Sequence, residues 1–119
     1  MIINDKERII DIKKPDNIFS GEVIFKHIIN KDILNNLGRV YSEVTIKPNS
    51  EVKFHTHINE FEIYHIIKGK GLYNDNNIEE KIVGPNDITY CPTNTGHAIK
   101  NISEDEDLVF IALILSDIN

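Results

Sequence analysis

Three histidines and a glutamate have the residue types and the spacing of a metal site. His55 and His57 lie two residues apart in the stretch EVKFHTH. Residues two apart on a β-strand project from the same face, with Cα atoms about 6.6 Å apart. Glu62 follows soon after, and His97 comes directly after a turn at residues 93–96. Three imidazole nitrogens and one carboxylate oxygen suit Mn, Fe, Co, Ni, Zn or Cu and leave coordination positions open. We therefore predict one divalent transition metal per chain.

Glu62 can join the two histidines only if the chain bends after His57. In an uninterrupted strand Glu62 would face away from His57, because facing alternates with every residue. We expect a bend or bulge across residues 58–60 that returns Glu62 to the same side. Glu60 has the same parity as Glu62 and therefore competes with it as the ligand; otherwise it lies at the opening of the site or faces solvent.

Few other side chains could supply acid–base chemistry at this ion. Tyr64 shares the parity of Glu62 and should point inward, either as a phenolic donor to a substrate or as core filling. Glu60 is the second catalytic candidate, and Tyr41 is a third. His65 has the opposite parity, so we expect it to face outward.

The elements that must position these residues are short strands. Apolar stretches are broken by turn residues at intervals of about 8–12 positions, which is typical of a β-sandwich or barrel. Strands are expected at residues 21–29, 39–46, 51–57, 61–67, 71–73, 79–83, 88–91, 97–102 and 108–115. Residues 31–37 could form one helical turn, which Gly38 would end.

The strand expected at residues 108–115 (LVFIALIL) is apolar at every position. A strand with one wet face would alternate, so we expect both faces to be buried. One face belongs to the core, and the other needs a cover, either the N-terminal segment or a second subunit. Ile63 and Ile67 add apolar surface on the face turned away from the metal. We therefore predict a homodimer built by sheet-to-sheet packing.

Composition excludes several classes of partner. The formal net charge is −6, and Lys and Arg are not clustered, which argues against nucleic-acid binding. The sequence has neither the apolar run of a secretory signal nor a stretch long enough to span a membrane. Its single cysteine, Cys91, cannot form an internal disulfide. We therefore expect a cytoplasmic protein with a small-molecule ligand and no membrane partner.

The metal-site residues fall in two motifs that resemble those of the cupin superfamily. The first cupin motif is Gly, five residues, His-x-His, three or four residues, Glu, six residues, Gly; its places are taken here by Asn49, His55, His57, Glu62 and Gly69. The second is Gly, five residues, Pro-x-Gly, two residues, His, three residues, Asn; its places are taken by Asn86, Pro92, Asn94, His97 and Asn101. Asparagine thus replaces three motif glycines. Since asparagine tolerates positive φ, at least one of the three should adopt it.

The resemblance implies an all-β fold, the double-stranded β-helix or jelly-roll barrel, with a short N-terminal extension. We assign the barrel to residues 39–116 and the extension, whose strands pack on the barrel, to residues 1–38. The motif spacing favours Glu62 over Glu60 as the ligand. Cupins include decarboxylases, dioxygenases, sugar isomerases and non-catalytic binders, so the fold does not give the reaction. The leading interpretation is a metal-dependent enzyme acting on a small carboxylate- or sugar-like molecule; the alternative is a non-catalytic binding module for a metal or a small molecule.

Overall fold

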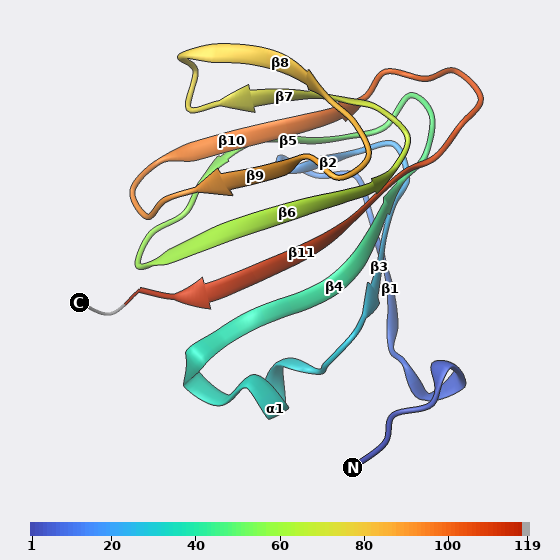
Figure 1. The fold of residues 1–119 in the computed structure, drawn as a ribbon, viewed down its shortest axis with the longest axis vertical. Helices are drawn as coiled ribbons and strands as arrows, with labels where there is room; N and C mark the ends of the chain where they lie inside the picture. The colour runs from blue at the N-terminus through green and yellow to red at the C-terminus, as the bar shows by residue number, and fades with distance from the viewer. Residues whose placement is uncertain (118–119) are drawn as a thin grey trace.

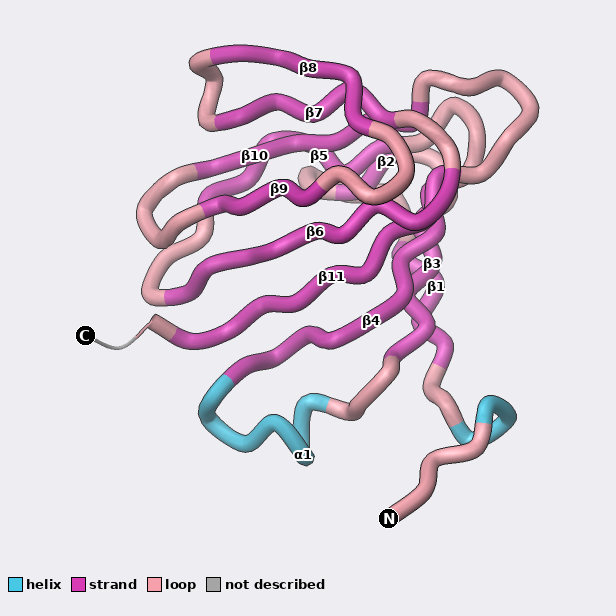
Figure 2. The backbone as a smooth tube through the Cα atoms, in the orientation of Figure 1, coloured by secondary structure: helices cyan, strands magenta, loops and turns pink. Residues whose placement is uncertain are grey.

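Two antiparallel β-sheets pack face to face in the computed structural model, which describes residues 1–117 (Figures 1 and 2). The six-stranded sheet has the order β1 (Ile10–Lys13), β3 (Val23–His27), β4 (Gly38–Ile46), β11 (Leu108–Ser116), β6 (Glu60–Lys68) and β9 (Ile88–Cys91). The five-stranded sheet has the order β2 (Phe19–Ser20), β5 (Glu51–Thr56), β10 (Gly96–Asn101), β7 (Gly71–Asp75) and β8 (Glu79–Val83). The prediction of a jelly-roll barrel is confirmed.

Helical structure is confined to short turns in the described residues. Helix α1 (Lys31–Leu34) and the 3-10 turn η2 (Asn35–Leu37) lie where the sequence predicts a helical turn before Gly38, and a second 3-10 turn, η1 (Asp5–Glu7), lies near the N-terminus. None of the helices among residues 1–117 is long and apolar enough to cross a membrane.

Alternation of apolar residues along the strands builds the core between the sheets. On β4 and β11 every second residue is buried, and the residues between them are partly or fully exposed. The largest fully buried apolar side chains are Ile46, Ile66, Ile99, Leu108 and Phe110. Burying a side chain of this size contributes about 1.5–3 kcal/mol to folding.

The N-terminal segment joins both sheets. Strand β1 pairs with β3 at the edge of the six-stranded sheet, and β2 pairs with β5 at the edge of the five-stranded sheet. The connection from Lys13 to Phe19 therefore crosses from one sheet to the other at one end of the barrel, as the blue ribbon shows in Figure 1. Because β1 adds a strand to the edge of the six-stranded sheet, it does not lie over the outer face of β11.

An apolar row crosses the outer face of the six-stranded sheet. Tyr41 on β4 pairs in register with Leu113 on β11, Leu113 with Ile63 on β6, and Ile63 with Tyr90 on β9. We call these four residues the outer row. Tyr90 is 56% exposed, and the other three are half-buried. Residues 1–117 of one chain therefore leave this row partly open to solvent.

Asparagine takes the place of glycine at several turns. Asn49, Asn86 and Asn94, which replace the motif glycines, have φ values of 60°, 72° and 65°. The expectation that at least one would adopt positive φ is confirmed for all three.

Asn86 gives a direct test of this backbone requirement because its side chain is exposed. We expect Asn86→Gly to change the free energy of unfolding by no more than about 0.5 kcal/mol and Asn86→Val to lower it by about 1–2 kcal/mol, since a β-branched residue is strained at φ 72°. Urea denaturation measures both values. A valine variant as stable as the wild type would contradict the prediction.

Candidate metal centre

Strands from both sheets bring the four predicted ligands together. His55 lies on β5 and His97 on β10, where the two are register partners in the five-stranded sheet. Glu62 lies on β6 of the six-stranded sheet, and His57 follows directly after β5. One donor atom from each of the four residues lies within 4.8 Å of the others. These four residues could hold one metal ion.

The expected bend between His57 and Glu62 is present. Strand β5 ends at Thr56, β6 begins at Glu60, and Asn59 between them has a φ of 58°. His57 is fixed in this bend by its backbone, which pairs with the turn before β10: its N–H donates to the Thr95 carbonyl at 3.0 Å, and its carbonyl accepts from Asn94 N–H at 2.7 Å. The bend returns Glu62 to the side of the histidines.

A second partner holds each of the three imidazoles at Nδ1. His55 Nδ1 lies 2.8 Å from the Lys53 carbonyl, His57 Nδ1 contacts the Glu60 carboxylate, and His97 Nδ1 lies 2.8 Å from the Tyr73 hydroxyl. The Nε2 atoms instead face Glu62, whose Oε1 lies 2.9 Å from Nε2 of both His57 and His97 and 3.9 Å from that of His55. Outer partners of this kind orient metal-binding imidazoles.

The charge at the centre is set by a buried carboxylate. Burial alone would raise the pKa of Glu62, but its three imidazole partners lower that pKa well below its usual value. Burial also lowers the pKa of His97, which favours its neutral form. An ionised carboxylate and a neutral imidazole are the forms that bind a cation.

Glu60, the competing ligand, holds a different position. It accepts two hydrogen bonds from the Arg39 guanidinium, both 2.8 Å long, and one from His57 Nδ1. The hydrogen bonds from Arg39 lower the pKa of Glu60, with His57 adding to the effect. Glu60 is therefore an ionised partner of His57 outside the ligand set.

The other sequence candidates divide between the two faces of the six-stranded sheet. Tyr64 points inward as expected: it is 3% exposed, and its ring stacks on that of His97 with 5.0 Å between centroids. Burial raises the pKa of Tyr64, so the phenol stays protonated. His65 is exposed, as expected. The prediction that Tyr41 could supply acid–base chemistry at the ion is wrong. Tyr41 alternates with the buried residues Val40 and Ser42 on β4 and lies in the outer row.

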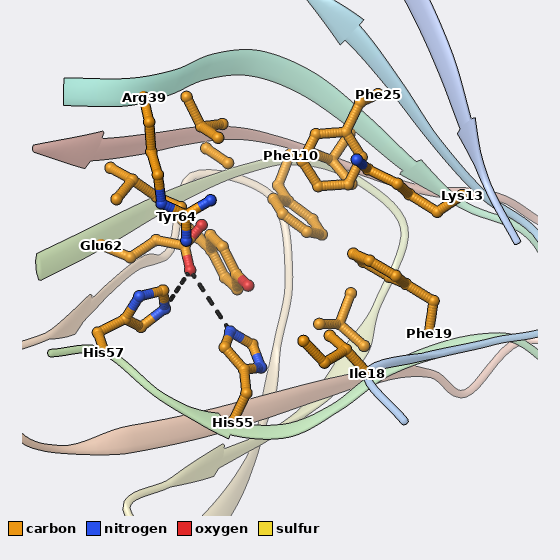
Figure 3. Close-up of a pocket in the computed structure, with 15 residues that line it drawn as sticks. Lys13, Ile18, Phe19, Phe25, Arg39, His55, His57, Glu62, Tyr64 and Phe110 are labelled. Atoms are coloured by element: carbon orange, nitrogen blue, oxygen red, sulfur yellow. Dashed lines mark hydrogen bonds and ion pairs between the residues drawn. The ribbon is translucent and has the colours of Figure 1, made fainter. Parts of the chain in front are cut away.

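A cavity of about 180 Å³ opens beside the four residues (Figure 3). His55, His57 and Glu62 line it together with Tyr64, whereas His97 is fully buried behind them. Pockets for drug-sized ligands have volumes of about 300–1,000 Å³. The cavity thus suits a smaller molecule.

Sequence reasoning missed three residues of this site: Arg39, Tyr73 and Lys13. Arg39 is the extra residue of a β-bulge, since the register moves from Ile114↔Val40 to Leu115↔Gly38. Such a bulge re-aims a side chain and has no local sequence signal here. Tyr73 reaches His97 from the neighbouring strand β7, and Lys13 lines the cavity from β1. Both positions depend on long-range pairing.

The fold and the motif geometry define a cupin, and comparison with known proteins agrees. The family model for the cupin domain matches residues 42–114, more than half of the chain. The chain therefore belongs to the cupin family.

Three comparisons with proteins of Thermotoga maritima cover most of the chain. An oxalate-binding protein is 34% identical over 95 residues, which cover 80% of this chain and 77% of that protein. The crystal structure of a predicted oxalate decarboxylase has a TM-score of 0.86 and 28% identity, covering 98% of this chain and 99% of the other. A cupin-like protein from the same organism, with a TM-score of 0.74 and 24% identity over 89% of this chain and 77% of its own, supports the fold alone.

Proton competition at His57 should make metal binding depend on pH. Burial alone would lower its pKa, but hydrogen bonds to Glu62 and Glu60 raise it above the usual value. Because a protonated Nε2 cannot bind a cation, affinity for Mn²⁺ should fall as the pH drops through this raised pKa. Glu60→Gln removes one of the two carboxylates, so we expect the midpoint of this loss to move to lower pH. At pH values above the midpoint, the variant should bind Mn²⁺ about tenfold more weakly than the wild type, because His57 loses its outer partner.

Mn²⁺ titrations between about pH 5 and 8 measure both effects, since this range spans imidazole ionisation. Glu79→Gln, on the exposed strand β8, is the control and should leave the curve unchanged. An unchanged or raised midpoint in Glu60→Gln would contradict the assigned role of Glu60.

Proposed function

We propose that this protein binds one divalent transition metal (Mn, Fe, Ni, Zn, Co or Cu) through His55, His57, Glu62 and His97. The ion and its surroundings then bind a small carboxylate. The observation that carries the proposal is the common arrangement of the three imidazoles, each with Nδ1 held by an outer partner and Nε2 turned towards Glu62. Three imidazole nitrogens and one carboxylate match the preferences of these metals.

The cavity and the relatives support a small carboxylate as the ligand. A bound divalent ion would supply positive charge that attracts and polarises an oxygen ligand. The cavity beside the four residues is small, and Tyr64 lines it as a protonated phenol that can donate a hydrogen bond. One relative is an oxalate-binding protein, which makes a carboxylate the first ligand class to test.

A metal-dependent enzyme acting on the same class of molecule is the second candidate. The similarity to a predicted oxalate decarboxylase favours it. Of the two acid–base candidates, Tyr64 is a neutral donor, and Glu60 is engaged by both Arg39 and His57. Neither is placed as a free general base, so ligand binding is the function that the geometry supports best.

The test starts from elemental analysis of the purified protein. We expect about one transition-metal ion per chain and calorimetric binding of at least one of oxalate and succinate by the Mn²⁺-loaded protein, with no binding after EDTA treatment. Release of formate or CO₂ from oxalate would establish the enzymatic alternative. Absence of metal, or carboxylate binding that persists without it, would overturn the proposal.

A further inference from the structure

The cavity beside the metal centre has two chemically different ends. The imidazoles and Glu62 form one end, and Figure 3 draws Lys13, Phe19 and Phe25 on the side away from His57. Most of the remaining lining is apolar, and includes Ile18, Val40, Val44, Val52, Phe110 and Ile114. A ligand made only of polar atoms would leave this wall without a matching partner.

The far end is built by the N-terminal segment that crosses between the sheets. Asp16 fixes this crossing, because its carboxylate accepts the backbone N–H groups of Ile18 and Phe19 at 2.7 and 2.8 Å. Lys53 ties the crossing to β5 through a 2.6 Å hydrogen bond from its N–H to the Ile18 carbonyl and a 2.7 Å bond from its ammonium to the Asp16 carbonyl. Ile18 and Phe19 are thereby held at the cavity wall.

Lys13 places a cation at this apolar end. Its Nζ lies 5.0 Å from the centroid of the Phe25 ring and 5.8 Å from that of Phe19. Among the described residues its hydrogen-bond partner is the Asp11 carboxylate at 2.7 Å, and the Lys13 side chain is 30% exposed. An ammonium has three donors, so the group retains capacity for a second anionic partner.

We infer that the ligand is a dicarboxylic acid with an apolar carbon chain between its two acid groups. This inference rests on the proposed function: one carboxylate binds at the metal centre, and the other binds the Lys13 ammonium. The carbon chain packs against the phenyl rings of Phe19, Phe25 and Phe110. Oxalate, which has no carbon between its carboxylates, lacks that chain.

Calorimetry on the Mn²⁺-loaded protein tests the inference with succinate, butyrate and oxalate. Butyrate has the chain length of succinate and lacks its second charge. We expect the wild type to bind succinate at least tenfold more tightly than butyrate and more tightly than oxalate. Lys13→Gln should weaken succinate binding about tenfold and leave butyrate binding unchanged, as expected for loss of one charge-assisted hydrogen bond at a partly exposed site. Lys13→Arg should retain the preference for succinate.

Lys26→Gln is the matched control. Lys26 lies on the adjacent strand β3, forms an ion pair with Asp5 at 2.6 Å and is 29% exposed, but it does not line the cavity. The Lys26→Gln variant should bind all three acids as the wild type does. Equal loss of succinate and butyrate in Lys13→Gln, or tighter binding of oxalate than succinate by the wild type, would overturn the inference. Manganese content of all variants is measured in parallel, because failure of the proposed function would appear as a lack of metal in the wild type.

Discussion

Replacing His55 with alanine is expected to abolish stoichiometric Mn²⁺ binding and to leave the barrel folded. The change removes one of the three Nε2 donors, and the loss should exceed the ~10–100-fold that outer partners of a metal site contribute. The core strands do not depend on this side chain, which is 17% exposed, hydrogen-bonds to the Lys53 carbonyl and lies 3.9 Å from the Glu62 carboxylate. His57→Ala and His97→Ala should lose the ion as well.

Elemental analysis after dialysis measures the bound metal, and far-UV circular dichroism reports the fold. His65→Ala is the control, since His65 lies on β6 like Glu62 but is exposed on the outer face. It should retain the wild-type metal content. Unchanged metal content in any two of the three ligand variants would show that the assigned centre is wrong.

The second large effect is expected on the oligomeric state. We propose that the protein is a homodimer packed through the outer row. Leu113 lies in the middle of that row, and Ile63 and Tyr41 flank it on the neighbouring strands. In a two-fold interface each residue meets the same patch of the partner. Leu113→Glu would therefore introduce two carboxylates into one apolar contact. We expect this variant to be a 13.7 kDa monomer and the wild type to have twice that mass.

Light scattering at neutral pH measures the mass of each form. Ile82→Glu is the control, because Ile82 is 64% exposed on β8 of the other sheet and should not affect the dimer. A wild type that stays at 13.7 kDa at high protein concentration would refute the proposed dimer.

The strands of the barrel were predictable because turn residues mark their ends. Gly84, Pro85 and Asn86, for example, separate β8 from β9, and both strands lie where the apolar pattern places them. The N-terminal extension was expected to contain strands, but the positions of β1 and β2 were not predicted, since β1 mixes charged residues with isoleucines and β2 has only two residues. Their strand structure depends on pairing with β3 and β5, and the local sequence does not indicate those partners.

The metal centre could also be predicted only in part. Strand parity and the bend at Asn59 were sufficient to bring His55, His57 and Glu62 to one side. The residues that surround them were not visible in the sequence, because Arg39 reaches Glu60 through a bulge and Tyr73 reaches His97 across a strand pair. Position along a strand predicts which face a side chain occupies. It does not predict which neighbour that side chain meets.

The division of the donors between the sheets has a thermodynamic consequence. Glu62 belongs to the six-stranded sheet, whereas His55 and His97 belong to the five-stranded sheet. An ion bound by all of them acts as a cross-link between the two layers, and the layers cannot separate without breaking its coordination. Binding at 100 times the dissociation constant stabilises a folded protein by about 2.7 kcal/mol. If the four residues bind an ion as proposed, metal supply would therefore affect the temperature at which the barrel unfolds.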